Sequence, residues 1–437
     1  MKNTLIDPSV VSATLEQFEV KDLNDASIRQ IGGIVNVLEQ KSGQEFIRLQ
    51  MGVPGLPPEK IGVEAEHKAL DSGIASVYPD LAGTPDLKRE ASRFLKAFIN
   101  VDVAPEGCMP TVGSMQGSYA AFTLCSQVDP KKDTILYIDP GFSVQKIQAD
   151  VIGIKRESFD LYDYRAEKLG PKLESYLANG NIAAILYSNP NNPTWMCLTE
   201  GELKTIGELA TKYDTIVIED LAYLAMDFRR ELGTPYQAPY QPSVSKYTDN
   251  YILLLSASKI FSYAGQRIAI MAISNKLFSR EFAELEKRYG LAKFGIVMLQ
   301  RIMYVLSSGT SHSPQYALAA MFKAAADGQL NFVEEVKEYG RRTKRLKEIF
   351  LRNGFHIVYD RDLEEPLSDG FFFTIGYRDV EGGELLRQML HYGVSGIVLS
   401  STGSLQQGLR VCASAVKPHH YDMLDERLRN FNANFEA

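Results

Sequence analysis

The chain has 437 residues, of which 45% are hydrophobic and 23% charged, and its formal net charge is −7. That length is enough for two domains with a large core, and the composition is that of an ordinary globular protein. The acidic balance and the lack of a dense basic stretch argue against a nucleic-acid partner, and the apolar runs are far too short to span a bilayer.

The cysteines and the N-terminal residues indicate in which cellular compartment the protein is expected. The four cysteines are widely spaced, and no C-x-x-C pair is present, so neither a zinc site nor a thiol–disulfide motif is predicted. Free thiols of this kind are typical of a reducing compartment. The first eight residues lack the apolar core of a signal peptide. We therefore expect a cytoplasmic protein without a metal site.

Short apolar runs alternate with longer helical patterns through the middle of the chain. Nearly all-apolar strands are typical of a sheet that is covered on both faces. Helical patterns such as 201–213 lie between them, and this βα alternation predicts an α/β fold with a mainly parallel sheet wrapped by helices. The predicted strands are 134–138, 151–155, 182–187, 215–218, 251–255 and 268–273.

The pattern changes near residue 313. Ser313-Pro314 is typical of a helix start, and the helical pattern runs to about residue 353 with a break near Gly328. Strands at 371–376 and 409–412 follow, with a closing helix from Tyr421. We expect a large domain over 56–313 and a smaller α+β domain formed by 1–55 and 314–437.

An apolar run ends at Leu255, the small residues Ser256-Ala257-Ser258 follow it, and Lys259 comes next. Loops at the ends of buried strands build the sites of α/β proteins. An amine that attacks an aldehyde must be partly deprotonated, which desolvation or neighbouring cations promote. An isolated lysine is more often a solvated surface residue, so Lys259 alone is weak evidence.

Two segments carry groups suited to an anion. Arg267 offers a fork of donors that fits a phosphate, and Ser256 offers a hydroxyl. Gly113-Ser114-Met115-Gln116-Gly117 precedes an apolar-periodic segment, 118–125. A glycine-containing turn that opens a helix exposes backbone N–H groups to an anion, although a plain loop-to-helix junction would have the same sequence.

Asp220 follows the predicted strand 215–218 and is a candidate partner for a ring nitrogen. A carboxylate at that edge of a sheet can keep a pyridine nitrogen protonated, or it can simply cap a helix. Tyr223 and Asn192 could donate hydrogen bonds to a ring oxygen, and Phe142 could stack on a flat cofactor. Core packing and turn formation are the ordinary alternatives for these three residues.

Arg410 lies in the apolar strand-like segment Gly408-Leu409-Arg410-Val411. A charged residue in such a context is costly unless it is paired. A substrate carboxylate would explain Arg410, and so would a buried ion pair.

Taken together, these residues resemble the class I/II aminotransferases, the aspartate aminotransferase-like enzymes of fold type I that use pyridoxal 5'-phosphate (PLP). The resemblance extends from about Gly52 to Arg410. It implies a large domain with a mainly parallel seven-stranded sheet and a smaller α+β domain. It also implies that Lys259 is the Schiff-base lysine that shuttles protons, and that Asp220 is the partner of the pyridinium nitrogen.

The same resemblance assigns the remaining contacts to the cofactor. Tyr223 and Asn192 match the pair that binds the ring oxygen, and Phe142 matches the stacking aromatic. The residues that match the phosphate cradle are Ser114, Met115, Ser256 and Arg267.

Three further positions concern the substrate and a second subunit. Arg410 resembles the arginine that binds the α-carboxylate, and Gly52 resembles the glycine whose backbone lies against the substrate. Tyr78 resembles the tyrosine that reaches the neighbouring subunit's phosphate, which implies a homodimer with shared active sites.

One position departs from the family pattern. The family usually has glycine after Asn-Pro-Thr, whereas this chain has Trp195, its only tryptophan. Glycine permits backbone angles that tryptophan resists. We therefore expect the loop after Asn192 to run differently, and Trp195 either to be buried or to line the substrate channel.

The function that the resemblance implies is ping-pong transfer of an amino group between an L-amino acid and a 2-oxo acid. A lyase of the C–S β-lyase type, a racemase or a decarboxylase of the same fold is the alternative. A PLP-sensing regulator is more remote, because the roughly fifty residues before Gly52 contain no basic helical run. The Tyr- and Pro-rich segment 236–251 could border an aromatic pocket or form a surface loop.

Overall fold

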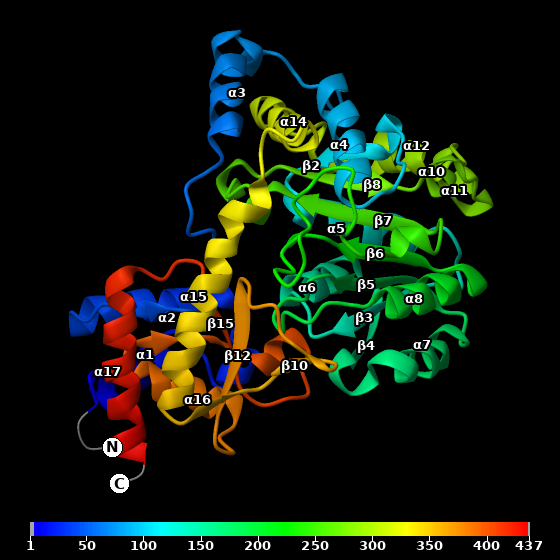
Figure 1. Ribbon diagram of the computed structural model, residues 1–437. Coiled ribbons are helices and arrows are strands. Elements are labelled where there is room, and N and C mark those ends of the chain that lie inside the picture. Colours follow the sequence, from blue (N-terminus) through cyan, green and yellow to red (C-terminus); the bar gives the residue numbers. More distant parts are fainter. Residues whose placement is uncertain (1–3, 436–437) are drawn as a thin grey trace. The chain divides into compact units, whose positions relative to one another are not determined.

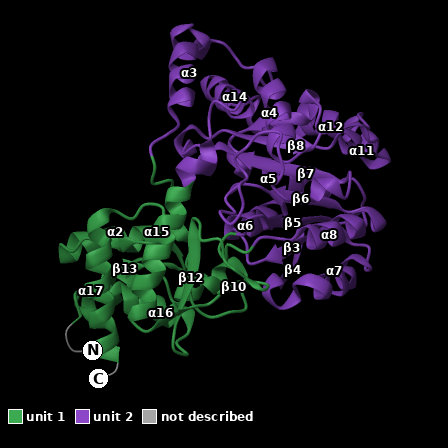
Figure 2. Ribbon diagram, in the orientation of Figure 1, with its two compact units in different colours: residues 1–56, 192–196, 337–437 green, residues 57–191, 197–336 purple. Residues whose placement is uncertain are grey.

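The computed structural model describes residues 4–435, which divide into two compact units (Figure 2). Unit 1 comprises 4–56, 192–196 and 337–435, and unit 2 comprises 57–191 and 197–336. Within the described residues, no helix is both long and apolar enough to cross a membrane.

Unit 2 is built on a seven-stranded sheet with the order β2-β8-β7-β6-β5-β3-β4 (Figure 1). The pairs from β7 to β4 are parallel, whereas β8 runs antiparallel to both β7 and β2. The predicted α/β class with a mainly parallel sheet is thus confirmed. The strands are β2 (Cys108–Thr111), β3 (Thr134–Asp139), β4 (Lys155–Asp160), β5 (Ile182–Ser188), β6 (Ile216–Asp220), β7 (Tyr251–Ser256) and β8 (Ala269–Ile273).

The two edges of this sheet are where the strand predictions failed. The predicted strand 151–155 is wrong, because its first two residues end helix α6 (Ser143–Ile152) and Gly153, at φ +81°, closes that helix. The observed edge strand β4 is largely polar, so it carries no apolar run. The opposite edge, β2, was missed because it is short and contains Pro110, which edge strands tolerate.

Helices flank the sheet of unit 2 (Figure 1). The predicted helix 201–213 is confirmed as α8, which starts at a capping box between Thr199 and Glu202. Besides α6, the α-helices of unit 2 are α3 (Lys60–Asp71), α4 (Pro85–Phe98), α5 (Gly113–Cys125), α7 (Leu169–Leu177), α8 (Glu200–Lys212), α9 (Ala257–Ile260), α10 (Asn275–Ser279), α11 (Ala283–Tyr289), α12 (Phe294–Val297), α13 (Tyr304–Ser307) and α14 (His312–Ala326).

Because helix α14 belongs to unit 2, the boundary between the units differs from the domain boundary that the sequence suggested. Within that unit, the carboxylate of Glu66 accepts from Ser313 Oγ at 2.9 Å and Gln315 Oε1 accepts from the Thr84 N–H at 2.8 Å. The boundary therefore falls at 336/337, inside α15 (Phe332–Arg352), and not at 313/314. The predicted break in the helical region near Gly328, at φ +72°, is confirmed.

Unit 1 holds a four-stranded antiparallel sheet in the order β14-β15-β12-β9. The predicted strands at 371–376 and 409–412 are confirmed as β12 and β15. Apolar residues of the first fifty positions, such as Ile34 and Leu38, share one buried core with them. The elements are α1 (Pro8–Gln17), α2 (Ile28–Ser42), β1 (Ile47–Arg48), β9 (Phe355–Ile357), β10 (Arg361–Asp362), β11 (Glu365–Pro366), β12 (Phe372–Tyr377), α16 (Gly382–Leu390), β13 (Val394–Ser395), β14 (Ile397–Val398), β15 (Leu409–Cys412) and α17 (Pro418–Phe435).

Candidate functional site

In unit 2, two candidate residues lie at the ends of neighbouring parallel strands. Asp220 is the last residue of β6, and Lys259 lies in α9, directly after β7. The two strands pair in register, with Asp220 opposite Leu254. The carboxyl ends of parallel strands meet at the same edge of a sheet, where α/β proteins build their sites. Asp220 is buried, whereas Lys259 is half-buried.

The carboxylate of Asp220 is held by neutral donors. Its Oδ1 accepts from the Ala222 N–H at 3.1 Å, and its Oδ2 accepts from Gln145 Nε2 at 3.0 Å. Burial raises the pKa of Asp220 from 3.8 to about 6. A desolvated carboxylate of this kind gains most from a cationic partner, because an opposite charge restores the favourable interaction that water supplied. A protonated pyridine nitrogen fits that requirement.

Gln145 was missed by the sequence analysis. It lies in the first turn of α6 and is 5% exposed, and its backbone carbonyl accepts from Tyr137 Oη at 3.0 Å. A glutamine in a helix has no motif that marks it, so only the fold reveals that its amide reaches Asp220.

A candidate phosphate cradle lies at the start of α5. Gly113 has φ +67°, and a β-carbon there would come within 2.4 Å of Arg267 Nη2, so the guanidinium lies against a bare backbone. Ser114 Oγ is buried and has no hydrogen-bond partner within residues 4–435. A buried hydroxyl, a helix N-terminus and a guanidinium together are the donor set that a phosphate needs. The residues therefore fit PLP.

Two other residues of the predicted cradle act mainly through their local structure. The carbonyl of Met115 accepts from Gln148 Nε2 at 2.7 Å, which fixes the first turn of α5. Ser256 Oγ accepts from the Ser258 N–H at 3.1 Å and so caps α9, while a hydroxyl can still donate its own proton.

The candidate ring contacts of unit 2 lie in the turns after β3 and β6. Phe142 is half-buried at the N-cap of α6, three residues before Gln145. Tyr223 is 5% exposed and lies in the turn after Asp220. Tyr78 behaves differently, since it follows the short 3₁₀ turn Ile74–Ser76 and is 91% exposed.

In unit 1, Arg410 lies on β15 with 2% exposure. Its Nη2 donates to the Gln50 carbonyl at 2.5 Å, and its Nη1 lies 3.5 Å from Asn192 Oδ1. Its guanidinium carbon lies 4.5 Å from the ring centroid of Phe372. Both of these acceptor oxygens belong to neutral groups.

Gly52 and Trp195 also belong to unit 1. A β-carbon on Gly52 would lie 2.8 Å from Phe372 Cζ, so the backbone passes close to that ring. Trp195 is fully buried, and its φ of +65° is the left-handed conformation that glycine favours. The loop thus keeps the backbone conformation expected of glycine, and the structure decides for a buried tryptophan.

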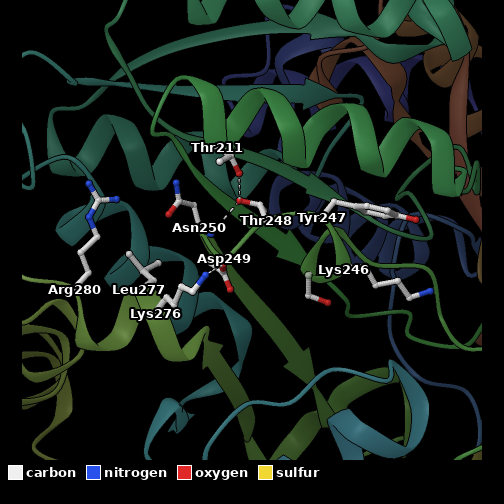
Figure 3. Close-up of a pocket in the computed structure, with 10 residues that line it drawn as sticks. Thr211, Lys246, Tyr247, Thr248, Asp249, Asn250, Lys276, Leu277 and Arg280 are labelled. Carbon is white, nitrogen blue, oxygen red and sulfur yellow. Dashed lines mark hydrogen bonds and ion pairs between the residues drawn. The ribbon is translucent and has the colours of Figure 1, made fainter.

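A separate cavity of about 660 Å³ lies at the opposite end of β7 (Figure 3). Its wall includes Thr248–Asn250, which precede β7, so a strand of roughly 20 Å separates it from Ser256. Its cations are already paired, for example Lys276 with Asp249 at 2.5 Å and Arg280 with Asp214 at 2.5 Å. An anionic ligand would have to break these ion pairs, so we do not assign the cavity to the site.

Glu45, His419 and His420 form a group whose possible ligand atoms lie within 4.8 Å of one another. The Lys417 N–H donates to Nδ1 of His420 at 3.3 Å, so in the neutral ring the proton is on Nε2. That nitrogen lies 3.0 Å from Glu45 Oε1 and donates to it. The arrangement is that of a surface hydrogen-bonded cluster, since a metal would need the lone pair of Nε2.

Comparison with known proteins identifies the family. Residues 45–428 match the family described as aminotransferase class I and II. A probable aspartate aminotransferase of Methanocaldococcus jannaschii is 26% identical over 76% of this chain and 80% of its own length. An LL-diaminopimelate aminotransferase of Aquifex aeolicus is 29% identical over 59% of this chain and 64% of its own length.

Solved structures show the same fold. An alanine aminotransferase of Pyrococcus furiosus aligns with a TM-score of 0.75 and 20% identity over 93% of this chain and 97% of its own. The aspartate aminotransferase of Thermus thermophilus with maleate aligns with a TM-score of 0.73 and 18% identity over 93% and 96%. From the family match over most of its length, this chain belongs to the class I and II aminotransferases, which are PLP-dependent enzymes.

Proposed function

We propose that this aminotransferase moves an amino group between an L-amino acid and a 2-oxo acid, with Lys259 as the residue that holds PLP. The observation that carries the proposal is the buried carboxylate of Asp220 at the end of β6, beside the strand that leads into Lys259. When bound, PLP would supply an electron sink for the negative charge that develops on the substrate's α-carbon.

The residues of unit 2 then have distinct roles. Lys259 Nζ would hold the cofactor, take the α-proton of the substrate and deliver a proton elsewhere on the conjugated system. Asp220, held by the amide of Gln145, keeps the ring nitrogen protonated. The hydroxyl of Tyr223 donates to the ring oxygen, and Phe142 stacks on the ring. The residues that bind the phosphate are Ser114, Met115 through its backbone, Ser256 and Arg267.

The residues of unit 1 orient the substrate. Arg410 binds the α-carboxylate, a role that suits a buried guanidinium with its fork of donors. Asn192, which lies beside Arg410, donates its amide to the ring oxygen of the cofactor. The backbone at Gly52 lies against the substrate.

A half-reaction separates transamination from the lyase, racemase and decarboxylase alternatives. The purified holoenzyme, given one amino acid at a time without a 2-oxo acid, should convert its cofactor to pyridoxamine phosphate and release one equivalent of 2-oxo acid. Absorbance spectra and product analysis over a panel of amino acids measure this. Release of ammonia or carbon dioxide with the cofactor unchanged would instead assign a lyase or a decarboxylase.

The same panel identifies the substrates. By name, the relatives act on aspartate, on LL-diaminopimelate and, for a protein of Escherichia coli that is 26% identical over 58% of this chain, on glutamate and pyruvate. These side chains differ in length and charge, so we propose the amino-acid and 2-oxo-acid class without choosing a member.

We propose the cytoplasm as the compartment, on the spacing of the cysteines, and cell fractionation with an activity assay tests it.

We also propose a homodimer in which Tyr78 serves the partner subunit's site. Its side chain is 91% exposed although it is large and aromatic, and Val77 beside it is 58% exposed, which suits residues that a second copy covers. We expect Lys259→Ala and Tyr78→Ala each to be nearly inactive at limiting PLP. A random mixture of the two should recover about a quarter of wild-type activity, because each hybrid dimer has one intact site.

Sedimentation of the mixture gives the oligomeric state alongside that assay. If Tyr78 served its own subunit, the hybrid would combine Lys259→Ala at one site with Tyr78→Ala at the other. No activity would then be recovered, and the shared-site proposal would fail.

A further inference from the structure

Trp195 stands where the family usually has glycine, and it keeps a left-handed backbone with φ +65°. A residue with a β-carbon is strained in that region, so its packing must offset the strain. Trp195 is fully buried, and it is among the largest fully buried side chains of the described residues. The contacts of its ring therefore show what the tryptophan supports.

The indole occupies space that Gly370 leaves open. A β-carbon on Gly370 would lie 1.9 Å from Trp195 Cε2 and 2.0 Å from its Cζ2, so no side chain fits at position 370. Thr343 Oγ1 donates to the Gly370 carbonyl at 2.6 Å and fixes this backbone. Trp195 and Gly370 are thus a matched pair, in which the bulk missing at one position is supplied at the other.

The indole meets Phe372, and Phe372 meets Arg410. The rings of Trp195 and Phe372 are edge-to-face, with centroids 6.3 Å apart and an interplanar angle of 63°. The guanidinium carbon of Arg410 lies 4.5 Å from the centroid of Phe372. The backbone of Gly52 also lies against Phe372. Phe372 is therefore enclosed by the indole, a bare backbone and the guanidinium.

We infer that Trp195 is a positioning residue for substrate carboxylates: it holds Phe372 in place, and Phe372 holds the plane of the Arg410 guanidinium. The inference rests on the proposed role of Arg410 in binding the α-carboxylate. The guanidinium carbon lies over the Phe372 ring and Nη2 donates to the Gln50 carbonyl, so both contacts constrain the orientation of the guanidinium. A bidentate bond depends on that orientation, since both N–H groups must face the two oxygens together.

The inference predicts a specific kinetic pattern. Trp195→Leu and Phe372→Leu should each raise the dissociation constants of propionate and maleate from the holoenzyme by about three- to tenfold. The KM values for amino acid and 2-oxo acid should rise by similar factors, with a smaller change in kcat. Trp195→Phe keeps an aromatic edge against Phe372 and should recover most of the loss. The affinity for PLP should not change.

Two further variants separate this role from stability and from the proposed function. Phe350→Leu removes a fully buried ring of the same unit that packs on Phe355 and Phe373, so it should lower the melting temperature and leave carboxylate binding unchanged. Arg410→Lys should weaken the binding of both propionate and maleate directly, because lysine cannot form the bidentate bond.

The dissociation constants are measured on folded holoenzyme by titration of the cofactor absorbance. Suppose that Arg410→Lys binds propionate and maleate more weakly, while Trp195→Leu and Phe372→Leu, like Trp195→Phe, bind them as tightly as wild type. The positioning role is then overturned, and the proposed function stands. If Arg410→Lys binds both carboxylates like wild type, the role of Arg410 fails and this inference fails with it. Should Trp195→Leu not fold, Phe372→Leu tests the contact through which Trp195 would act: weaker carboxylate binding supports that contact, and unchanged binding overturns the role of Trp195 as well.

Discussion

Replacing Lys259 with alanine is expected to lower kcat by about 10⁴-fold or more while the protein stays folded. In the proposed mechanism Lys259 both holds the cofactor and moves the α-proton, so no neighbouring group replaces it. Its side chain lies in the short helix α9 and is only half-buried, so truncation should leave no large cavity. The rate of the half-reaction with the best amino acid measures the loss, and circular dichroism reports the fold.

Lys276→Ala is the matched control for this variant. Lys276 lies just after β8, its side chain is 79% exposed, and it pairs with Asp249 at 2.5 Å beside the cavity at the far end of β7. Exposed ion pairs contribute little to stability, so this variant should keep wild-type turnover. A Lys259→Ala enzyme that turned over at a rate near that of Lys276→Ala would remove Lys259 from the chemistry.

Asp220→Asn is expected to reduce turnover by about 10²- to 10⁴-fold, because an amide cannot keep the ring nitrogen protonated and the electron sink weakens. Gln145 can turn its own amide to pair with the new one, so the local hydrogen bonds survive. The loss should appear in kcat of the half-reaction rather than in the binding of carboxylates. A variant with wild-type kcat would show that Asp220 does not hold the ring nitrogen.

The same substitution should stabilise the protein without cofactor at high pH. Burial raises the pKa of Asp220 to about 6, so between pH 4 and 6 the folded protein holds a proton that the unfolded chain has lost. Stability from this group therefore falls as pH rises through that window and is lowest above pH 6. Above pH 6 the buried charge of Asp220 lowers the free energy of unfolding by at most about 3 kcal/mol, since each pKa unit corresponds to about 1.4 kcal/mol. Asparagine carries no charge and removes this destabilisation.

Urea unfolding of the two apoproteins at pH 4.5 and pH 8 tests the sign. Asp220→Asn should exceed wild type at pH 8, and the advantage should shrink at pH 4.5. An advantage that was equal at both pH values, or larger at pH 4.5, would contradict a raised pKa at Asp220.

The sequence was most informative where burial and motif coincide. The all-apolar interior strands of the large sheet were predicted closely, because a strand covered on both faces has no polar positions to confuse the pattern. Lys259 and Asp220 were chosen as candidates because each lies at or just after the end of such a strand. Family membership came from the joint spacing of these residues with Asn192, Arg267 and Arg410, and the family match bears it out.

The failures have physical causes that lie outside local sequence. The edge strand β4 is largely polar, so it looked like a loop, while the apolar end of α6 looked like a strand. Helix α14 is apolar over much of its surface, which shows that it is covered but not by which unit. Gln145 reaches Asp220 over a separation of 75 residues, which only the packing of the strands creates.

Trp195 shows a different limit. The sequence identified it as a departure and predicted a loop that runs differently, whereas the backbone keeps the left-handed conformation that glycine favours. The sequence also could not show whether the ring is buried. Gly370 supplies the answer, 175 positions later, because its missing side chain provides the space for the indole. A pair of residues that are distant in sequence but complementary in size is recognised only when the structure gives the positions of both.

The covalent bond between Lys259 and PLP is tested most directly by reducing the holoenzyme with sodium borohydride, which fixes the cofactor on the amine that holds it. Peptide mass spectrometry should then find one phosphopyridoxyl group per chain, on Lys259 alone. A label on another lysine, or an unmodified Lys259 in protein whose cofactor absorbance has been bleached by the reduction, would contradict the account.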